Sequence, residues 1–154
     1  MILGDNMFIE TISFSKSSTF SQCKLKYNYK YVQRLNGDKP RNEDSLNFGS
    51  YIHKVLEEGV EAKCMKDLQS LAEQHKKRYK IPFSYKEKTN RCLSNFLNFN
   101  GKLGETVATE LMYEVSLDKK HSIKQNGIID RVIKGSNGGY LIIDYKTSKR
   151  EKNK

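Results

Sequence analysis

Tryptophan is absent from this chain, proline occurs only twice, and no apolar run approaches the ~18 residues that a membrane-spanning helix needs. The N-terminus has no basic segment followed by an apolar core, so we expect neither a secretion signal nor a membrane span. The three cysteines, Cys23, Cys64 and Cys92, are odd in number and widely spaced, which excludes a C-x-x-C zinc or redox motif. Free thiols indicate a reducing compartment, and we expect the cytoplasm of a bacterium or of a phage-infected cell.

Positive charge is what the chain has in excess. Its 154 residues include 28 Lys and Arg against 18 Asp and Glu, a formal net charge of +10. A solvated surface would explain some of this charge, but the imbalance favours a polyanionic partner, because positive potential gathers phosphates before specific contacts form. The length fits one domain with a real hydrophobic core.

The first half of the sequence is predicted to be helical. Apolar residues recur at helical spacing from Phe20 to Leu35, and Ser17 and Ser18 are candidate N-caps. A polar loop is expected over 36–44. Three further helices are expected at about 48–62, over 68–79 and after Pro82.

The second half is rich in β-branched and aromatic residues. Three strands are predicted, over 107–117, 122–133 and 140–146, and the short turns between them indicate an antiparallel meander. Helices followed by strands predict an α+β fold in which the N-terminal helices pack on a mixed sheet. We expect a single domain over 1–154, with 149–154 as a basic tail.

Two acidic residues interrupt apolar strands. Asp144 and Lys146 are two residues apart, so in a strand they would share a face, and Asp130 occupies a similar apolar segment upstream. If the two strands are neighbours, the two carboxylates repel each other unless a cation lies between them. Mg²⁺, or Mn²⁺, is the natural candidate, and the lysine can stabilise charge developing on a phosphate.

A third candidate residue, His53, lies in the second predicted helix. Gly49, four residues before it, would let the helix approach another element closely, and Glu57, four residues after it, could hold the imidazole. His53 is therefore a candidate metal ligand, although a lone histidine in a helix is more often a surface or packed residue.

These segments together resemble the RecB-like branch of the PD-(D/E)XK nuclease superfamily, which includes the nuclease domains of RecB and AddB, CRISPR-associated exonucleases and phage exonucleases. The matching segments, in the family's order, are STFSQCKLKY (18–27), FGSYIH (48–53), TELMY (109–113), GIIDRV (127–132) and IDYKT (143–147). The resemblance implies a restriction-endonuclease-like core. It also implies that His53, Asp130 and Asp144 are metal ligands, that Asp130, Asp144 and Lys146 are catalytic, and that Glu110, rather than Glu114, is a further acid near the metal.

The resemblance implies a Mg²⁺-dependent deoxyribonuclease, of a branch whose members are often exonucleases in recombination, repair or phage DNA metabolism. Lys24, Lys26, Lys30 and Arg131 are the candidate DNA-backbone contacts, with a structural role equally open for Arg131. One alternative is a non-catalytic DNA-binding or assembly protein on the same scaffold. Another is a nuclease that acts on RNA.

The chain departs from the family pattern in two ways. Family members carry a further helix with a Gln and a Tyr after the lysine strand, whereas this sequence stops at Lys154, so we expect a truncated domain or a partner that supplies the missing part. Some relatives hold an iron–sulfur cluster through one early and three late cysteines. Only the early one, Cys23, is present, so we expect no cluster in this chain.

A few other residues have alternative interpretations. Tyr27 and Tyr31 fit core packing better than base stacking, while both roles are open for Tyr29. Cys23 is expected to be a small buried apolar residue. The remaining histidines, His75 and His121, are expected at the surface.

Overall fold

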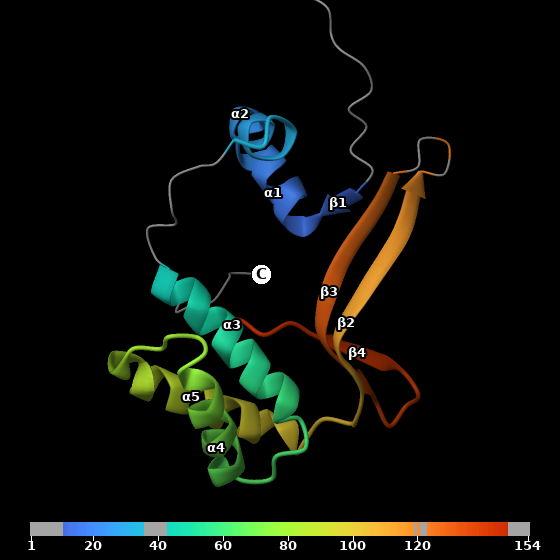
Figure 1. Ribbon diagram of the computed structural model, residues 1–154. Coiled ribbons are helices and arrows are strands. Elements are labelled where there is room, and N and C mark those ends of the chain that lie inside the picture. The colour runs from blue at the N-terminus through green and yellow to red at the C-terminus, as the bar shows by residue number, and fades with distance from the viewer. Residues whose placement is uncertain (1–10, 36–42, 119, 121–122, 148–154) are drawn as a thin grey trace, which may run out of the picture. The chain divides into compact units, whose positions relative to one another are not determined.

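The computed structural model describes residues 11–35, 43–118, 120 and 123–147 (Figure 1). The chain divides into two compact units, one formed by residues 1–39 and 112–128 and the other by residues 40–111 and 129–154. The expected basic tail over 149–154 and His121 lie outside the described residues.

The first unit contains β1 (Thr11–Ser13), α1 (Phe14–Gln22), α2 (Lys24–Tyr27) and a π-helical turn, η1 (Asn28–Val32). It also includes the C-terminal part of β2 (Glu105–Asp118) and the N-terminal part of β3 (Ile123–Lys134). β1 was not predicted from the sequence. It pairs with β3 in parallel, with Thr11 opposite Lys124 and Ser13 opposite Asn126.

The first helical segment begins earlier than predicted and is interrupted. Ser13, rather than Ser17 or Ser18, is the N-cap of α1, because its backbone is extended and its side chain accepts a hydrogen bond from Lys16 N at 3.3 Å. The helix stops at Cys23, where the backbone is again extended, and Cys23 Sγ accepts a bond from Lys26 N at 3.4 Å. Cys23 is exposed, so the prediction that it is buried was wrong.

The second unit contains α3 (Glu43–Glu58), α4 (Met65–Lys76), a 3₁₀ turn η2 (Phe83–Tyr85) and α5 (Lys86–Asn100). α3 begins about five residues earlier than predicted, because Glu43 and Asp44 form an acidic first turn that suits the positive end of the helix dipole. The three helices bury one hydrophobic core. Its members with the lowest exposure are Phe48, Tyr51, Ile52, Val55, Leu68 and Leu93.

The strands of the second unit continue from β2 and β3 into β4 (Tyr140–Ile143). β4 is antiparallel to β3, with Arg131 opposite Ile143 and Lys134 opposite Tyr140. β2 is the hydrogen-bonded neighbour of β3, and the two run in opposite directions (Figure 1). The predicted α+β class and mixed sheet are confirmed. The strand predicted over 140–146 ends at Ile143, so Asp144 and Lys146 lie beyond the sheet ladder.

In the parts of the chain that the structure describes, no helix has both the length and the apolar character needed to cross a bilayer.

Truncating a core leucine should destabilise the fold far more than truncating an exposed one. Leu68 is 0% exposed, so Leu68→Ala should lower the free energy of unfolding by about 2–5 kcal/mol, because it leaves a cavity among the helices. Leu46→Ala is the matched control, since Leu46 is 58% exposed on α3. Urea unfolding measures both, and equal losses would contradict the proposed core.

Acid should weaken the contact between α3 and α4. Glu58 Oε2 lies 2.8 Å from His75 Nε2, and this hydrogen bond lowers the pKa of Glu58. A carboxyl whose pKa is depressed by folding stabilises the fold above its unfolded pKa, and this contribution disappears as pH falls through the folded pKa. The free energy of unfolding of the wild type should therefore exceed that of Glu58→Gln at neutral pH. The difference should vanish below the ordinary glutamate range, and a difference independent of pH would exclude the mechanism.

Candidate metal centre

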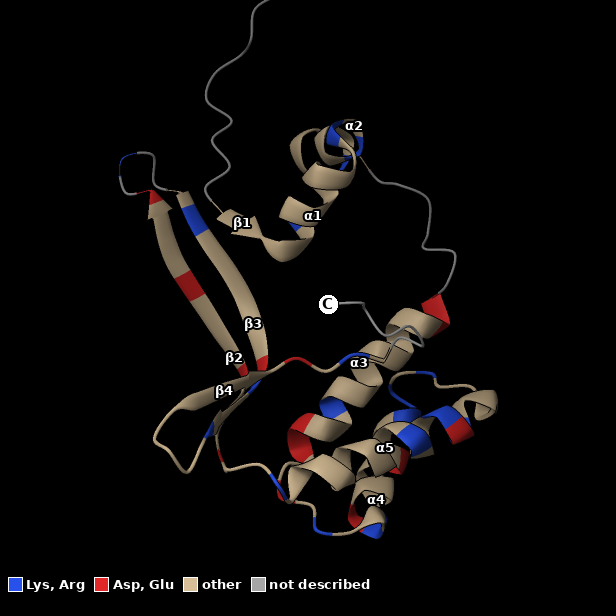
Figure 2. Cartoon of the chain, turned by 180° about the vertical axis from the view of Figure 1, so that it is seen from behind, with Lys and Arg blue, Asp and Glu red and all other residues tan. Residues whose placement is uncertain are grey.

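Three side chains from separate elements converge in the second unit. His53 of α3, Glu110 of β2 and Asp130 of β3 each offer one ligand atom, and these atoms lie within 4.8 Å of one another. His53 Nδ1 is 3.4 Å from Asp130 Oδ1 and 4.0 Å from Glu110 Oε1. Figure 2 shows red acidic bands of β2 and β3 side by side next to β4. The structure thus brings together three of the residues that the sequence singled out.

Strand alternation directs Asp130 into this group. Adjacent residues in a strand point to opposite faces, so Asp130 faces His53 whereas Arg131 is buried on the other face. The side chain of Asp130 is only 10% exposed. Its Oδ2 atom accepts a hydrogen bond from the backbone N–H of Tyr145 at 2.5 Å, which holds the carboxylate in place.

Glu110 reaches the group through an unusual backbone. Its φ is +46°, in the left-handed region of backbone conformation. Residues other than glycine adopt this region at a cost of about 1–3 kcal/mol. Residues 108, 109 and 110 are all partly buried, so the regular alternation of β2 breaks here. The alternative acid, Glu114, belongs to the other unit and pairs with Lys124 at 2.6 Å.

A backbone carbonyl determines which nitrogen of His53 carries the proton. His53 Nε2 is 3.0 Å from the carbonyl oxygen of Tyr145, and a carbonyl can only accept, so Nε2 is assigned as the donor. In the neutral ring, Nδ1 then presents a lone pair to the carboxylates of Asp130 and Glu110. Glu57, the partner expected from the sequence, instead pairs with Lys54 at 2.9 Å.

The electrostatics of the group favour a cation. Burial, followed by the negative charge of Asp130, raises the pKa of Glu110 above its ordinary value. A divalent cation among the three ligand atoms would remove this repulsion. Two carboxylates and one imidazole suit Mn²⁺ or Mg²⁺, and three protein ligands leave positions for water and phosphate oxygen.

Asp144 is not part of this group among the described residues, although the sequence predicted it to be a ligand. The β4 ladder ends one residue earlier, and Asp144 Oδ1 accepts a bond from Lys146 Nζ at 2.6 Å. Both side chains are more than half exposed. The structure therefore keeps the two residues together, as their spacing predicts, and separates Asp144 from the three convergent ligands.

The sequence left a structural role and a DNA contact equally open for Arg131, and its surroundings favour the structural role. It is 2% exposed, and its guanidinium donates to Thr106 Oγ1 and Asn100 Oδ1. The other candidate DNA contacts lie in the first unit: Lys24 and Lys26 are on α2, and Lys30 is in η1. Lys24 lies over the ring of Phe20 and Lys30 over that of Tyr31.

An open groove gives access to two of the candidate ligands, His53 and Glu110. Its volume is about 680 Å³, and its lining includes Ser45, Gly49, Ser50, His53, Lys54, Glu110 and Thr147. We call it the α3 groove. Among the residues that the structure describes, a Cβ atom at Gly49 would meet only Thr147 Oγ1, at 3.8 Å, which is ordinary contact. The sequence suggested that Gly49 lets the helix approach another element closely. The described part of the chain makes no such close approach at Gly49, because there is room for a Cβ atom. The missing side chain of Gly49 leaves the groove open.

The comparisons with known proteins identify bacterial relatives of this chain. Curated relatives include an ATP-dependent helicase/deoxyribonuclease subunit from Streptococcus agalactiae serotype Ia, which is 27% identical over 157 residues and matches 89% of this chain. The protein of the same name from Streptococcus mutans serotype c is 25% identical over 154 residues and matches 90% of the chain. The chain spans about 14% of the length of each. No solved structure matches it.

The family comparison covers both units. The model of the PD-(D/E)XK nuclease superfamily matches residues 11–154, which include every strand and helix described above. The streptococcal relatives are consistent with the RecB-like branch that the motif order indicated. The chain therefore belongs to the PD-(D/E)XK nuclease superfamily.

Proposed function

We propose that this chain is the catalytic part of a metal-dependent deoxyribonuclease. One observation carries the proposal: an imidazole and two carboxylates from α3, β2 and β3 converge within 4.8 Å, and two of them, His53 and Glu110, line an open groove. Membership of a nuclease superfamily and a net charge of +10 support a nucleic acid as the substrate.

The residues of the site have distinct roles in phosphodiester hydrolysis. His53, Glu110 and Asp130 would hold the cation, which lowers the pKa of bound water and polarises the phosphate. Lys146 would offset negative charge that develops on the phosphate, and its present partner Asp144 shows that the amine can bind an anionic oxygen. The hydroxyls of Ser45, Ser50 and Thr147 line the groove where a phosphate would enter.

We also propose that DNA is the substrate and that the chain acts as an exonuclease beside a protein partner. The named relatives are subunits of a helicase/deoxyribonuclease, which supports both DNA and a larger assembly. A role in recombination, repair or phage DNA metabolism would follow. Linear and circular DNA of the same sequence distinguish exonuclease from endonuclease activity, and a matched RNA addresses the alternative substrate.

A non-catalytic DNA-binding or assembly protein is the second candidate. The observation that favours it is the ion pair between Asp144 and Lys146, which engages both residues outside the three convergent ligands. This candidate predicts DNA binding without metal-dependent cleavage.

The proposed nuclease should require both the cation and Lys146. With Mn²⁺ or Mg²⁺, the wild type should shorten linear DNA, and EDTA should abolish the reaction. Lys146→Ala should lower the rate by about 100-fold or more, because it removes a charge that stabilises the transition state. Lys102→Ala, an exposed lysine near the end of α5, is the control and should retain activity. DNA binding without cleavage by the wild type would reject the catalytic proposal.

Filling the α3 groove should block the substrate without removing the metal. Gly49→Phe would place a ring among the groove residues and should reduce cleavage strongly. Gly49→Ala should preserve activity, since its methyl group fits at ordinary contact distance. Isothermal titration with Mn²⁺ should give similar affinities for both variants and the wild type. Full activity of Gly49→Phe would show that DNA does not use this groove.

A further inference from the structure

Tyr145 contacts two of the three candidate ligands through its main chain, and its ring also meets the His53 imidazole edge-on, with ring centroids 6.2 Å apart. Its N–H donates to Asp130 Oδ2, and its carbonyl oxygen accepts from His53 Nε2. One residue thus orients a carboxylate from β3 and an imidazole from α3. A shift of this backbone would disturb both ligands together.

The sheet does not hold Tyr145 in place. The ladder between β3 and β4 ends with Arg131 opposite Ile143, two residues before it. Residues 144–147 have no regular secondary structure. Besides the two hydrogen bonds to the ligands, the side chain of Tyr145 is the candidate for fixing the backbone at this position.

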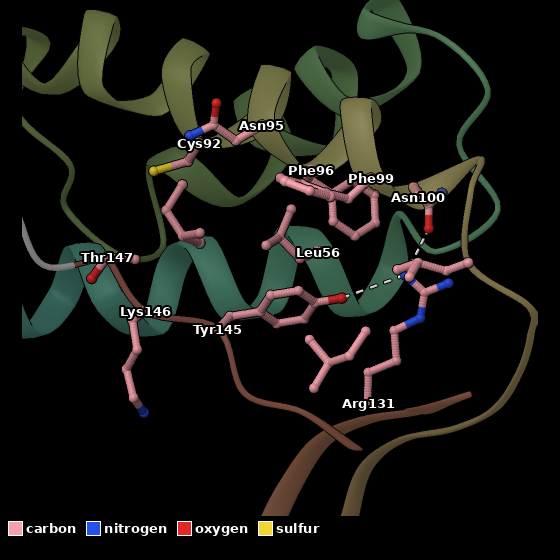
Figure 3. A pocket seen from close by; sticks show the side chains of 13 residues that line it. Leu56, Cys92, Asn95, Phe96, Phe99, Asn100, Arg131, Tyr145, Lys146 and Thr147 are labelled. Carbon is pink, nitrogen blue, oxygen red and sulfur yellow. Dashed lines mark hydrogen bonds between the residues drawn. The ribbon is translucent and has the colours of Figure 1, made fainter. Parts of the chain in front are cut away.

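The ring of Tyr145 is anchored in the apolar wall of a cavity of about 340 Å³ between α3, α5 and the segment after β4. It packs edge-on against Phe96 with ring centroids 6.0 Å apart, and it belongs to the border of the hydrophobic core. Figure 3 shows its hydroxyl pointing toward Arg131, while Lys146 points away from the cavity. The ring therefore attaches an irregular segment to the helical core.

Arg131 holds the far end of this anchor. Its Nη1 atom donates to Asn100 Oδ1 at 2.6 Å and lies 3.5 Å from the Tyr145 hydroxyl, which is the outer limit of a hydrogen bond (Figure 3). Its Nε and Nη2 atoms donate to Thr106 Oγ1 at 3.0 and 2.6 Å. Asn100 is itself fixed, because its Nδ2 donates to the carbonyl oxygen of Val60 at 2.9 Å. The guanidinium thus joins β2, β3 and α5 behind the ring.

We propose that Tyr145 is a positioning residue of the metal centre. Its side chain, anchored by Phe96 and Arg131, packs against the His53 ring and fixes the peptide groups that orient His53 and Asp130. The inference deepens the proposed function and rests on it for the metal. Outer hydrogen bonds of this kind fix the tautomer of a metal-binding histidine, and their loss typically costs about 10- to 100-fold in metal affinity.

The test compares Tyr145→Ala with two matched variants. Tyr145→Phe keeps the ring and loses only the long hydroxyl contact. Tyr85→Ala removes another tyrosine ring that borders the same core and packs against Phe48, away from the ligands. If Tyr145→Ala does not fold by circular dichroism, Tyr145→Leu takes its place.

Two readouts separate positioning from stability. In metal-free protein, ¹⁵N shifts of the histidine rings report whether Nε2 or Nδ1 carries the proton, and His75 serves as the internal reference. In Tyr145→Ala, His53 should redistribute its proton while His75 stays unchanged, and the Mn²⁺ affinity should fall about 10- to 100-fold. Tyr145→Phe should restore both properties, and Tyr85→Ala should lower only the stability.

Wild-type His53 shifts and Mn²⁺ affinity in folded Tyr145→Ala would overturn the proposal. Equal changes in Tyr85→Ala would also overturn it, because they would reflect general loosening of the core. If the wild type binds no Mn²⁺, the proposed function fails, and the metal-free histidine shifts still decide whether Tyr145 positions His53.

Discussion

The convergence of His53, Glu110 and Asp130 is the constraint on which the candidate metal centre depends. The carbonyl of Tyr145 faces Nε2 of His53, so Nδ1 is the ring nitrogen that faces the two carboxylates. In water such groups would separate. Here a helix and two strands hold them together, supported by a core whose residues on α3 are almost fully buried. Burial and the mutual repulsion of the two carboxylates raise the pKa of Glu110, and a divalent cation between them would offset that repulsion.

Much of the arrangement follows from local sequence rules. Apolar residues that recur at helical spacing or alternate along a strand predict most of the helices and strands. Alternation along β3 also predicts that Asp130 and Arg131 face opposite sides of the sheet. The order of short motifs identifies the superfamily, which the family comparison confirms. These features depend on neighbours within a few residues, so a pattern in the sequence can represent them.

The remaining features depend on groups that have no sequence signature. The hydrogen-bond partner of His53 is a main-chain carbonyl 92 residues away, where any side chain could stand. Strand β4 and its pairing with β3 both end at Ile143, although the strand-like pattern of the sequence continues to Tyr145. Glu110 points inward through a left-handed backbone that a glutamate rarely adopts. Each is decided by tertiary structure, so periodicity could not reveal it.

The left-handed backbone of Glu110 has an evolutionary consequence. Glycine adopts that conformation freely and asparagine does so more readily than glutamate, so either would relieve the backbone strain at this point of β2. Selection for heat resistance alone would therefore tend to remove the glutamate, and only a demand for its carboxylate would retain it. Thermal robustness and chemistry thus compete at one residue, as happens where a protein gives up stability for activity.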